Sequence, residues 1–220
     1  MRGLVLPCIL GLVACSGAEP VQQSNEDMPT AQTAPQPAAT SNMSSEGSAS
    51  PTRGTAPSSP DQPLAATGWG PLRIGMSVAE VVAALGPDSN SGAVGGPDPE
   101  ACDQFHPARA PEGLLVMIED GKLTRISLID GATLRTDRGL GVGDSKAKVV
   151  STYGASADET PHKYEAAPAV YVTVWKAGGG TGDYVQNAAA RGIVYEIGAN
   201  GRVQAIHAGG PSIQYVEGCA

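Results

Sequence analysis

An internal repeat is the sequence feature that most constrains how this chain can fold. The segment "GMSVAEVVAALG" at residues 75–86 and the segment "GDSKAKVVSTYG" at residues 143–154 are identical at six of twelve positions. Unrelated segments of this length share roughly one position by chance. A second pair, "DGKLTRI" at residues 120–126 and "NGRVQAI" at residues 200–206, follows the first pair in the same order. The chain therefore contains one structural unit twice, and the two units must pack side by side or end to end.

The first segment of each copy predicts a short helix. In the earlier copy Ser77 is placed to cap the helix, and Glu80 has the spacing of a capping box. Gly86 supplies a left-handed stop. A single apolar stripe is expected at the i, i+3, i+4 and i+7 positions, which are Val78, Val81, Val82 and Leu85. The later copy keeps the serine and the glycine but has lysine in place of the glutamate, so its helix should be weaker.

The second segment of each copy predicts an antiparallel hairpin. Asp120-Gly121 and Asn200-Gly201 lie between apolar runs and are the dipeptides that two-residue primed turns require. "ACDQFHP" and "PAVYVTVWKA" are candidates for a third strand in each copy. We therefore predict an α+β fold of two tandem repeats, residues 67–137 and 138–220, each with a short helix followed by about three antiparallel strands.

The first fifteen residues predict export and lipid attachment. The apolar run from residue 4 to residue 14 follows one arginine and is too short to span a membrane, so residues 1–14 are expected to be a signal peptide. The run ends in "LVAC", which resembles the bacterial lipobox and implies a lipid-modified N-terminus at Cys15. Ser16 implies sorting to the outer membrane. A plain secretory leader with an incidental cysteine is the alternative.

Residues 15–66 are expected to be a disordered tether. This stretch is rich in Pro, Ser, Thr, Ala and Gln and contains no aromatic residue, so it cannot bury enough apolar surface to offset chain entropy. A coil of this length has a reach of roughly 40 Å. The folded part should therefore stand clear of the membrane.

A family resemblance is carried by the first helix segment. "GPLRIGMSVAEVVAALGPD", residues 70–88, is similar to the opening helix motif of the SmpA/OmlA, or BamE-like, outer-membrane lipoproteins. The tandem arrangement resembles the beta-lactamase inhibitor protein fold. The chain departs from the BamE-like pattern in its two copies, its long tether and the lack of a recognisable partner-binding loop. The resemblance implies a fold, and no binding residue of the family carries over to this chain.

Two cysteines of the predicted folded part are expected to form a disulfide. Cys102 follows the first helix segment and Cys219 is the penultimate residue, and an oxidising exported compartment favours their pairing. The bond would join the C-terminal tail to the first repeat. A reactive or metal-binding thiol is the alternative, and His106 with Asp103 and Cys102 forms a conceivable metal site.

The sequence predicts no catalytic residue, metal ligand or cofactor. The motifs G-x-S-x-G, H-E-x-x-H and C-x-x-C are absent. His162 is expected in a solvated loop, and His207 is expected on a strand as a partly buried, hydrogen-bonded imidazole. "GGGTG" at residues 178–182 lacks the Gly-Lys-Ser/Thr ending of a phosphate loop, so a flexible loop without a nucleotide is expected. A net charge of −8 at pH 7 without a basic cluster argues against nucleic acid as a partner.

The functional expectation is a non-enzymatic, outer-membrane-anchored lipoprotein that faces the periplasm and binds an envelope protein or serves an envelope-structural role. Trp175, Asp183 and Tyr184, in and beside the long loop after the "PAVYVTVW" strand, are the predicted partner-binding residues, because aromatic side chains dominate protein interfaces. A protein inhibitor of a periplasmic or secreted hydrolase is the alternative. An envelope hydrolase is a third interpretation.

Overall fold

The structure, a computed structural model, describes residues 62–92, 94–182 and 184–219. The predicted signal peptide 1–14, the predicted lipidation site Cys15 and the predicted tether up to residue 61 lie outside the described residues. No helix of the described part combines the length and the hydropathy that crossing a membrane requires.

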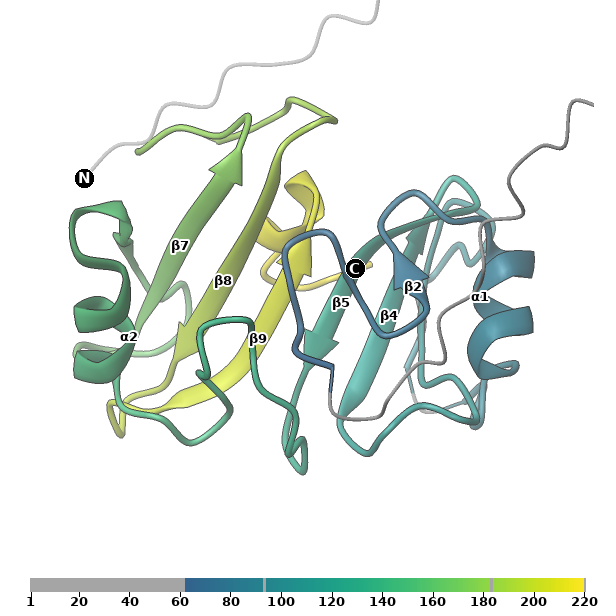
Figure 1. Ribbon diagram of the computed structural model, residues 1–220, viewed down its shortest axis with the longest axis horizontal. Coiled ribbons are helices and arrows are strands. Elements are labelled where there is room, and N and C mark those ends of the chain that lie inside the picture. The colour runs from purple at the N-terminus through teal and green to yellow at the C-terminus, as the bar shows by residue number, and fades with distance from the viewer. Residues whose placement is uncertain (1–61, 93, 183, 220) are drawn as a thin grey trace, which may run out of the picture. The chain divides into compact units, whose positions relative to one another are not determined.

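A seven-stranded antiparallel sheet forms the centre of the fold (Figure 1). In the order of the sheet, the strands are β3 (Cys102–Phe105), β4 (Leu114–Glu119), β5 (Lys122–Leu128), β9 (Val203–Gly209), β8 (Arg191–Ile197), β7 (Val170–Ala177) and β6 (Asp158–Pro161). A small second sheet pairs β1 (Gly68–Trp69) with β2 (Leu72–Arg73). The helices are α1 (Val78–Leu85) and α2 (Lys146–Tyr153), and the short 3-10 turns are η1 (Gly154–Ser156) and η2 (Pro211–Gln214). The predicted α+β class is confirmed.

The strand count differs between the two halves of the chain. Three strands of the large sheet follow α1, as predicted, whereas four follow α2. The additional strand, β6, lies at the sheet edge and is mostly exposed. Its sequence "DETP" has no apolar alternation, so no periodic signal marks it as a strand.

Local chemistry explains both helices. Before α1, the backbone N–H of Ser77 donates to the Glu80 carboxylate over 2.8 Å and the N–H of Glu80 donates to the Ser77 hydroxyl over 3.4 Å, which is the predicted capping box. Val81 and Leu85 are buried, whereas Val78 is exposed at the first turn. Before α2 the cap consists of one bond to the Ser145 hydroxyl, so α2 has the weaker cap, as predicted.

Each helix is joined to its hairpin by the same backbone hydrogen bonds. In both halves the glycine that precedes the helix donates to the hairpin's second strand, and the first helical N–H donates to the hairpin's turn glycine. These bonds are Gly75 to Leu123 (2.7 Å), Gly143 to Val203 (2.8 Å), Val78 to Gly121 (3.3 Å) and Lys146 to Gly201 (2.9 Å). The two halves therefore use one geometry to hold a helix against a hairpin.

The two hairpin turns differ. Asp120 and Gly121 have φ values of 47° and 70° and form the predicted two-residue primed turn between β4 and β5. The prediction for Asn200-Gly201 is wrong, because Gly198 donates to the carbonyl of Arg202 and the turn encloses three residues. The Asn200 side chain accepts from the N–H of Arg202 over 2.9 Å, and Gly201 alone has a positive φ. This is the three-residue hairpin with a glycine bulge.

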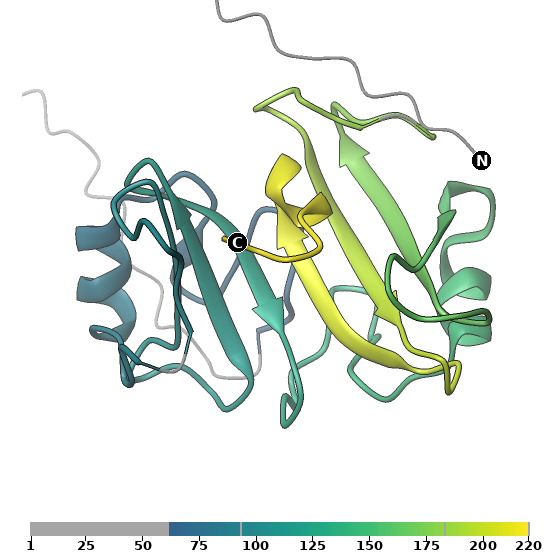
Figure 2. The ribbon, with the colours of Figure 1, turned by 180° about the vertical axis from the view of Figure 1, so that it is seen from behind.

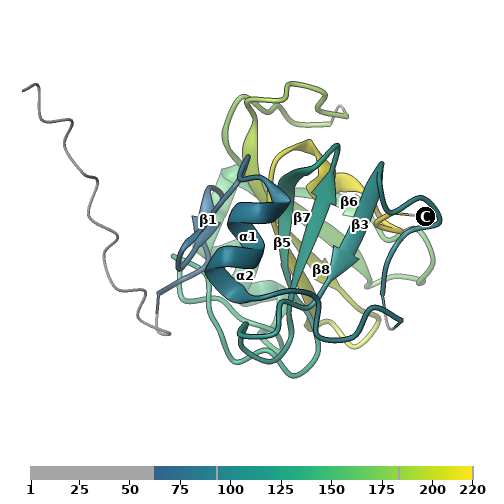
Figure 3. The same ribbon diagram turned by 90° about the vertical axis from the view of Figure 1, so that its right-hand side faces the viewer.

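One face of the sheet holds the hydrophobic core. Figure 3 shows α1 and α2 on one side of the strands and the C-terminal segment on the other. The core joins alternate strand residues of both halves to the inward residues of the helices and of the small sheet. Leu64 belongs to this core with 0% exposure, and its N–H donates to the carbonyl of Arg135 over 2.8 Å. The folded part therefore begins before the predicted boundary at residue 67. The residues around Leu64 give no local signal of structure, and Leu64 is buried by residues that are distant in the sequence.

Candidate functional site

A cleft of about 310 Å³ lies on the face of the sheet opposite the helices. Its floor consists of side chains from three adjacent strands of the second half. These are Tyr171, Thr173 and Trp175 of β7, Val194 and Glu196 of β8, and His207 of β9. Because neighbouring strand residues point to opposite faces, Val172, Ile193 and Ile206 point into the core instead.

Two segments form the walls of the cleft. Ile213, Gln214, Tyr215 and Val216, from η2 and the residues after it, form one wall. Asp158, Thr160 and Pro161 of β6, with Lys163, Gly182 and Tyr184, complete the lining. Seen from behind in Figure 2, η2 and the C-terminal segment lie in front of the sheet. The shape of the cleft therefore depends on the position of the C-terminal segment.

Two of the three predicted partner-binding residues meet in this cleft. Trp175 lies in its floor and Tyr184, with 57% of its surface exposed, lies in its lining. Asp183 lies outside the described residues. The indole of Trp175 is half-buried, and a β-carbon at Gly179 or Gly192 would collide with it. The glycine-rich loop thus packs its backbone against Trp175, which gives a physical reason for glycine at residue 179.

A carboxylate with several polar neighbours lies in the floor. Oε1 of Glu196 accepts hydrogen bonds from Nε2 of His162 at 3.1 Å and from the Gln204 amide at 2.8 Å. Oε2 lies 3.6 Å from Nε2 of His207. The imidazole of His207, followed by the bonds from His162 and Gln204, lowers the pKa of the Glu196 carboxyl to about 2 despite partial burial. The floor of the cleft therefore carries a negative charge at neutral pH.

The expectation for His162 is wrong, whereas that for His207 is confirmed. His162 is buried rather than solvated. Its ring stacks on Tyr171 with centroids 4.6 Å apart, and its Nδ1 accepts the backbone N–H groups of Tyr164 and Glu165. No periodic pattern in the sequence indicates that His162 is buried. Its position is set by the turn that follows β6, an edge strand without apolar alternation. His207 is a partly buried imidazole on β9, and its Nδ1 lies 2.8 Å from the Ser127 hydroxyl.

Ser127, His207 and Glu196 place a hydroxyl, an imidazole and a carboxylate on three adjacent strands. A catalytic serine must reach the carbonyl carbon of a substrate. Ser127 is 2% exposed and does not line the cleft, so its hydroxyl has no access to a bound molecule. Burial lowers the pKa of His207, and its neutral ring can accept the Ser127 hydroxyl at Nδ1. This geometry favours a buried network that joins β5 to β9 over nucleophilic catalysis.

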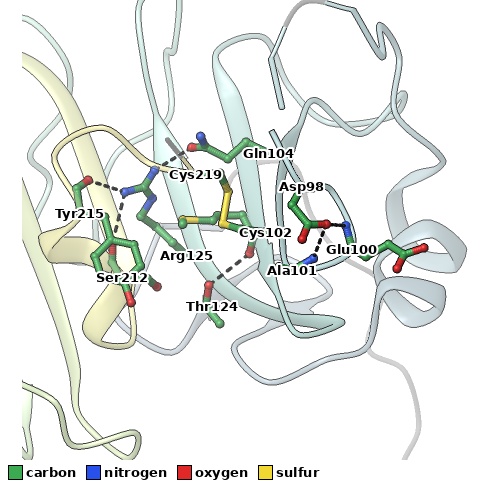
Figure 4. Close-up of a disulfide and its surroundings, with 11 residues drawn as sticks. Asp98, Glu100, Ala101, Cys102, Gln104, Thr124, Arg125, Ser212, Tyr215 and Cys219 are labelled. Atoms are coloured by element: carbon green, nitrogen blue, oxygen red, sulfur yellow. Dashed lines mark hydrogen bonds between the residues drawn. A yellow bond between two sulfur atoms is a disulfide. The ribbon is translucent and has the colours of Figure 1, made fainter. Parts of the chain in front are cut away.

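Two clamps fix the C-terminal wall of the cleft (Figure 4). The sulfur atoms of Cys102 and Cys219 lie at disulfide distance, 2.09 Å, which is the predicted pairing and attaches the tail to β3. The buried guanidinium of Arg125 donates to the carbonyls of Ser212 and Tyr215 and to the Gln104 side chain, over 3.2, 3.0 and 2.7 Å.

The conceivable metal site around His106 is not formed. The Cys102 sulfur is in the disulfide, and Nδ1 of His106 donates to the carbonyl of Leu114 over 3.0 Å. Among the described residues, no group of three or more His, Cys, Asp or Glu side chains is placed to hold a metal ion.

The fold and the cleft define an α+β protein with an aromatic-lined cleft, one wall of which is its own C-terminal tail. Comparison with protein-family models, with curated proteins and with solved structures found no match. The BamE-like resemblance of residues 70–88 therefore stays a prediction.

Proposed function

We propose that this chain is an exported lipoprotein, anchored at the periplasmic face of the outer membrane, that binds another envelope protein without catalysing a reaction. Support for the anchor comes from "LVAC" at the end of a short apolar run and from the linker composition that follows. Support for binding comes from the cleft.

We also propose that the fold arose from two tandem BamE-like repeats. Support comes from the six identical positions, from the matching helix-to-hairpin hydrogen bonds and from the strand pairing at the centre of the sheet. Ser127 and His207 each lie seven residues after the Asp-Gly or Asn-Gly pair begins, and they face one another across β5 and β9. Equivalent residues that pair with each other are expected where a two-fold axis passes between two copies.

The observation that carries the binding proposal is the concentration of aromatic side chains in one cleft. Tyr171, Trp175, Tyr184 and Tyr215 all line it, and Tyr184 and Tyr215 are exposed. Aromatic residues in pockets are the anchors that contribute most to binding in protein interfaces. Burial of Ser127 supports a binding site rather than a hydrolytic one.

Site-specific crosslinking from the cleft tests this proposal. A photoreactive phenylalanine analogue replaces Tyr184 in the full chain, envelopes are irradiated, and crosslinked proteins are isolated in detergent. The matched control replaces Tyr164, which is 61% exposed and lies outside the cleft lining. We expect one discrete protein adduct from position 184 that is absent from position 164, and lost when Trp175→Ala is added to a chain that still folds.

Equal adducts from both positions, or none from position 184, would contradict binding of an envelope protein at the cleft. A discrete adduct with a hydrolase would favour the inhibitor alternative, and the activity of that hydrolase with and without the chain would then decide between the two functions.

A further inference from the structure

We propose that the cleft receives a basic side chain, arginine or lysine, of the protein partner, with the Glu196 carboxylate as its counter-ion. This inference rests on the proposed binding function and names the chemistry that its site recognises.

The charges of the lining favour a cation. Asp158 and Glu196 contribute two carboxylates to the cleft, and Lys163 contributes one ammonium group. That ammonium lies 3.1 Å from the carboxylate of Glu217, which is outside the lining and compensates its charge. His207 is held neutral by burial. The lining is therefore negative, and the net charge of −8 for the whole chain adds a long-range attraction for cations.

Glu196 has an oxygen with room for a donor from a ligand. An ionised carboxylate can accept about four hydrogen bonds. Oε1 accepts from His162 and Gln204, whereas Oε2 has one long contact of 3.6 Å with Nε2 of His207, so Oε2 keeps acceptor capacity for a second donor. A guanidinium or ammonium group above the floor can donate to Oε2 without displacing the bonds at Oε1.

The walls supply the second component of cation recognition. Arginine and lysine side chains bind over the faces of tryptophan and tyrosine rings. Tyr171 pairs with Glu196 in the sheet register, Trp175 lies farther along β7 in the same floor, and the exposed rings of Tyr184 and Tyr215 line the walls. A volume of about 310 Å³ is at the lower end of the range for small-ligand pockets, so it accommodates one long side chain and not a helix.

A glycan would also use aromatic rings and carboxylates, but the lining suits it less well. Sugar hydroxyls both donate and accept hydrogen bonds, so a glycan site needs donors as well as acceptors. The Gln214 amide is already used, because its oxygen accepts from Val185 and its nitrogen donates to the carbonyls of Val185 and Pro211. The remaining neutral donors are the hydroxyls of Thr160, Thr173 and the tyrosines and the indole N–H of Trp175, whereas the carboxylates of Asp158 and Glu196 add a negative charge that a neutral glycan does not compensate.

The test uses the full chain in detergent and three probes. The first is the blocked pentapeptide Gly-Gly-Arg-Gly-Gly, the second is the same peptide with neutral citrulline in place of arginine, and the third is chitotriose. The readout is the indole N–H signal of Trp175 in NMR spectra, and the buried Trp69 indole is the internal control. We expect the arginine peptide to shift the Trp175 signal saturably, and the citrulline peptide to bind at least tenfold more weakly.

Matched variants separate charge from the aromatic contribution. Glu196→Gln should weaken the arginine peptide roughly tenfold, whereas Glu100→Gln, which removes the same charge outside the cleft lining, should leave it unchanged. Because Glu196 also orders two histidines, Tyr184→Leu and Tyr184→Phe provide a second test at an exposed position. Leucine should weaken binding about two- to fivefold, and phenylalanine should preserve it.

Equal binding of the arginine and citrulline peptides would overturn the inference, and so would a Trp175 shift caused by chitotriose alone. If crosslinking from Tyr184 succeeds while the two peptides bind equally, the binding function stands and cation recognition fails. If crosslinking fails while the arginine peptide binds selectively, cation recognition stands and the cleft serves a partner other than an envelope protein.

Discussion

Removal of the disulfide between Cys102 and Cys219 should destabilise the whole folded part. The bond closes a loop with a sequence separation of 117. In the chain-entropy model, a loop of this length lowers the entropy of the unfolded chain by about 16 cal/mol/K, which corresponds to about 5 kcal/mol at 25 °C. Domains are stable by only about 5–15 kcal/mol in total. The double variant Cys102→Ala/Cys219→Ala should therefore lose a third or more of the free energy of unfolding, measured by urea denaturation of the full chain.

The local effect should be confined to the end of the tail. Arg125 holds the carbonyls of Ser212 and Tyr215 independently of the disulfide. The N–H groups of Ile213 and Tyr215 donate within η2 and the turn after it, whereas that of Gly218 makes only a long bond of 3.5 Å. In hydrogen exchange at low denaturant, the disulfide variant should lose protection at Gly218 and keep it at Ile213 and Tyr215.

Arg125→Met is the matched perturbation, because it removes the second clamp and leaves the disulfide in place. Three acceptors lose the guanidinium donor, which should cost about 2–4 kcal/mol, and protection should fall at Ile213 and Tyr215. Reduced wild-type protein should reproduce the disulfide variant. A loss below about 1 kcal/mol on removing the disulfide, or the same exchange pattern in both variants, would refute the view that two separate clamps hold the wall.

Two further predictions concern acid stability and anchoring. Burial lowers the pKa of His207. Below about pH 6.5 the unfolded chain therefore binds a proton at this residue that the folded chain does not bind. The free energy of unfolding should fall by up to about 1.4 kcal/mol per pH unit as the pH drops through this range. His207→Asn, whose amide oxygen can accept from Ser127, should flatten this slope between pH 7.5 and 5.5 in urea titrations, and an unchanged slope would assign it to other groups. Cys15→Ala should release the chain from the membrane fraction or leave it unprocessed, whereas Cys8→Ala should do neither; normal cleavage with full membrane retention in Cys15→Ala would contradict lipid attachment.

The elements that could be predicted from the sequence are those determined by neighbouring residues. The capping box of Ser77 and Glu80 and the turn at Asp120-Gly121 need only short-range chemistry, and both are present. Burial of Leu64 and formation of β6 require partners far along the chain, so the local pattern does not reveal them. The prediction of a two-residue turn at Asn200-Gly201 is wrong because Gly198 pairs with Arg202 around a three-residue loop, a turn that Asn-Gly also fits with Gly201 at the positive φ.

The candidate site was predictable only in part for the same reason. Trp175 and Tyr184 stand near a long glycine-rich loop, which marked them as candidates. Glu196, His207 and Tyr215 join them through strand register and through the path of the tail. Alternation along β7 indicated that Tyr171, Thr173 and Trp175 share one face, but not that the C-terminal segment would build a wall over it.

The C-terminal tail makes the two halves of the fold unequal, because it is attached to the first half. The residue at one equivalent position explains this choice. Under the proposed duplication, the position that matches Arg125 in the second copy is Ala205, five residues after the start of each turn pair. The guanidinium of Arg125 reaches the carbonyls of Ser212 and Tyr215, whereas a methyl group at Ala205 offers the tail no donor. The tail is therefore fastened over the first half, where Cys219 meets Cys102, and its near edge borders the open floor of the second half. The contacts that hold the tail over the first half also place residues 213–216 as one wall of the cleft, so the stability of the tail and the shape of the cleft depend on the same residues.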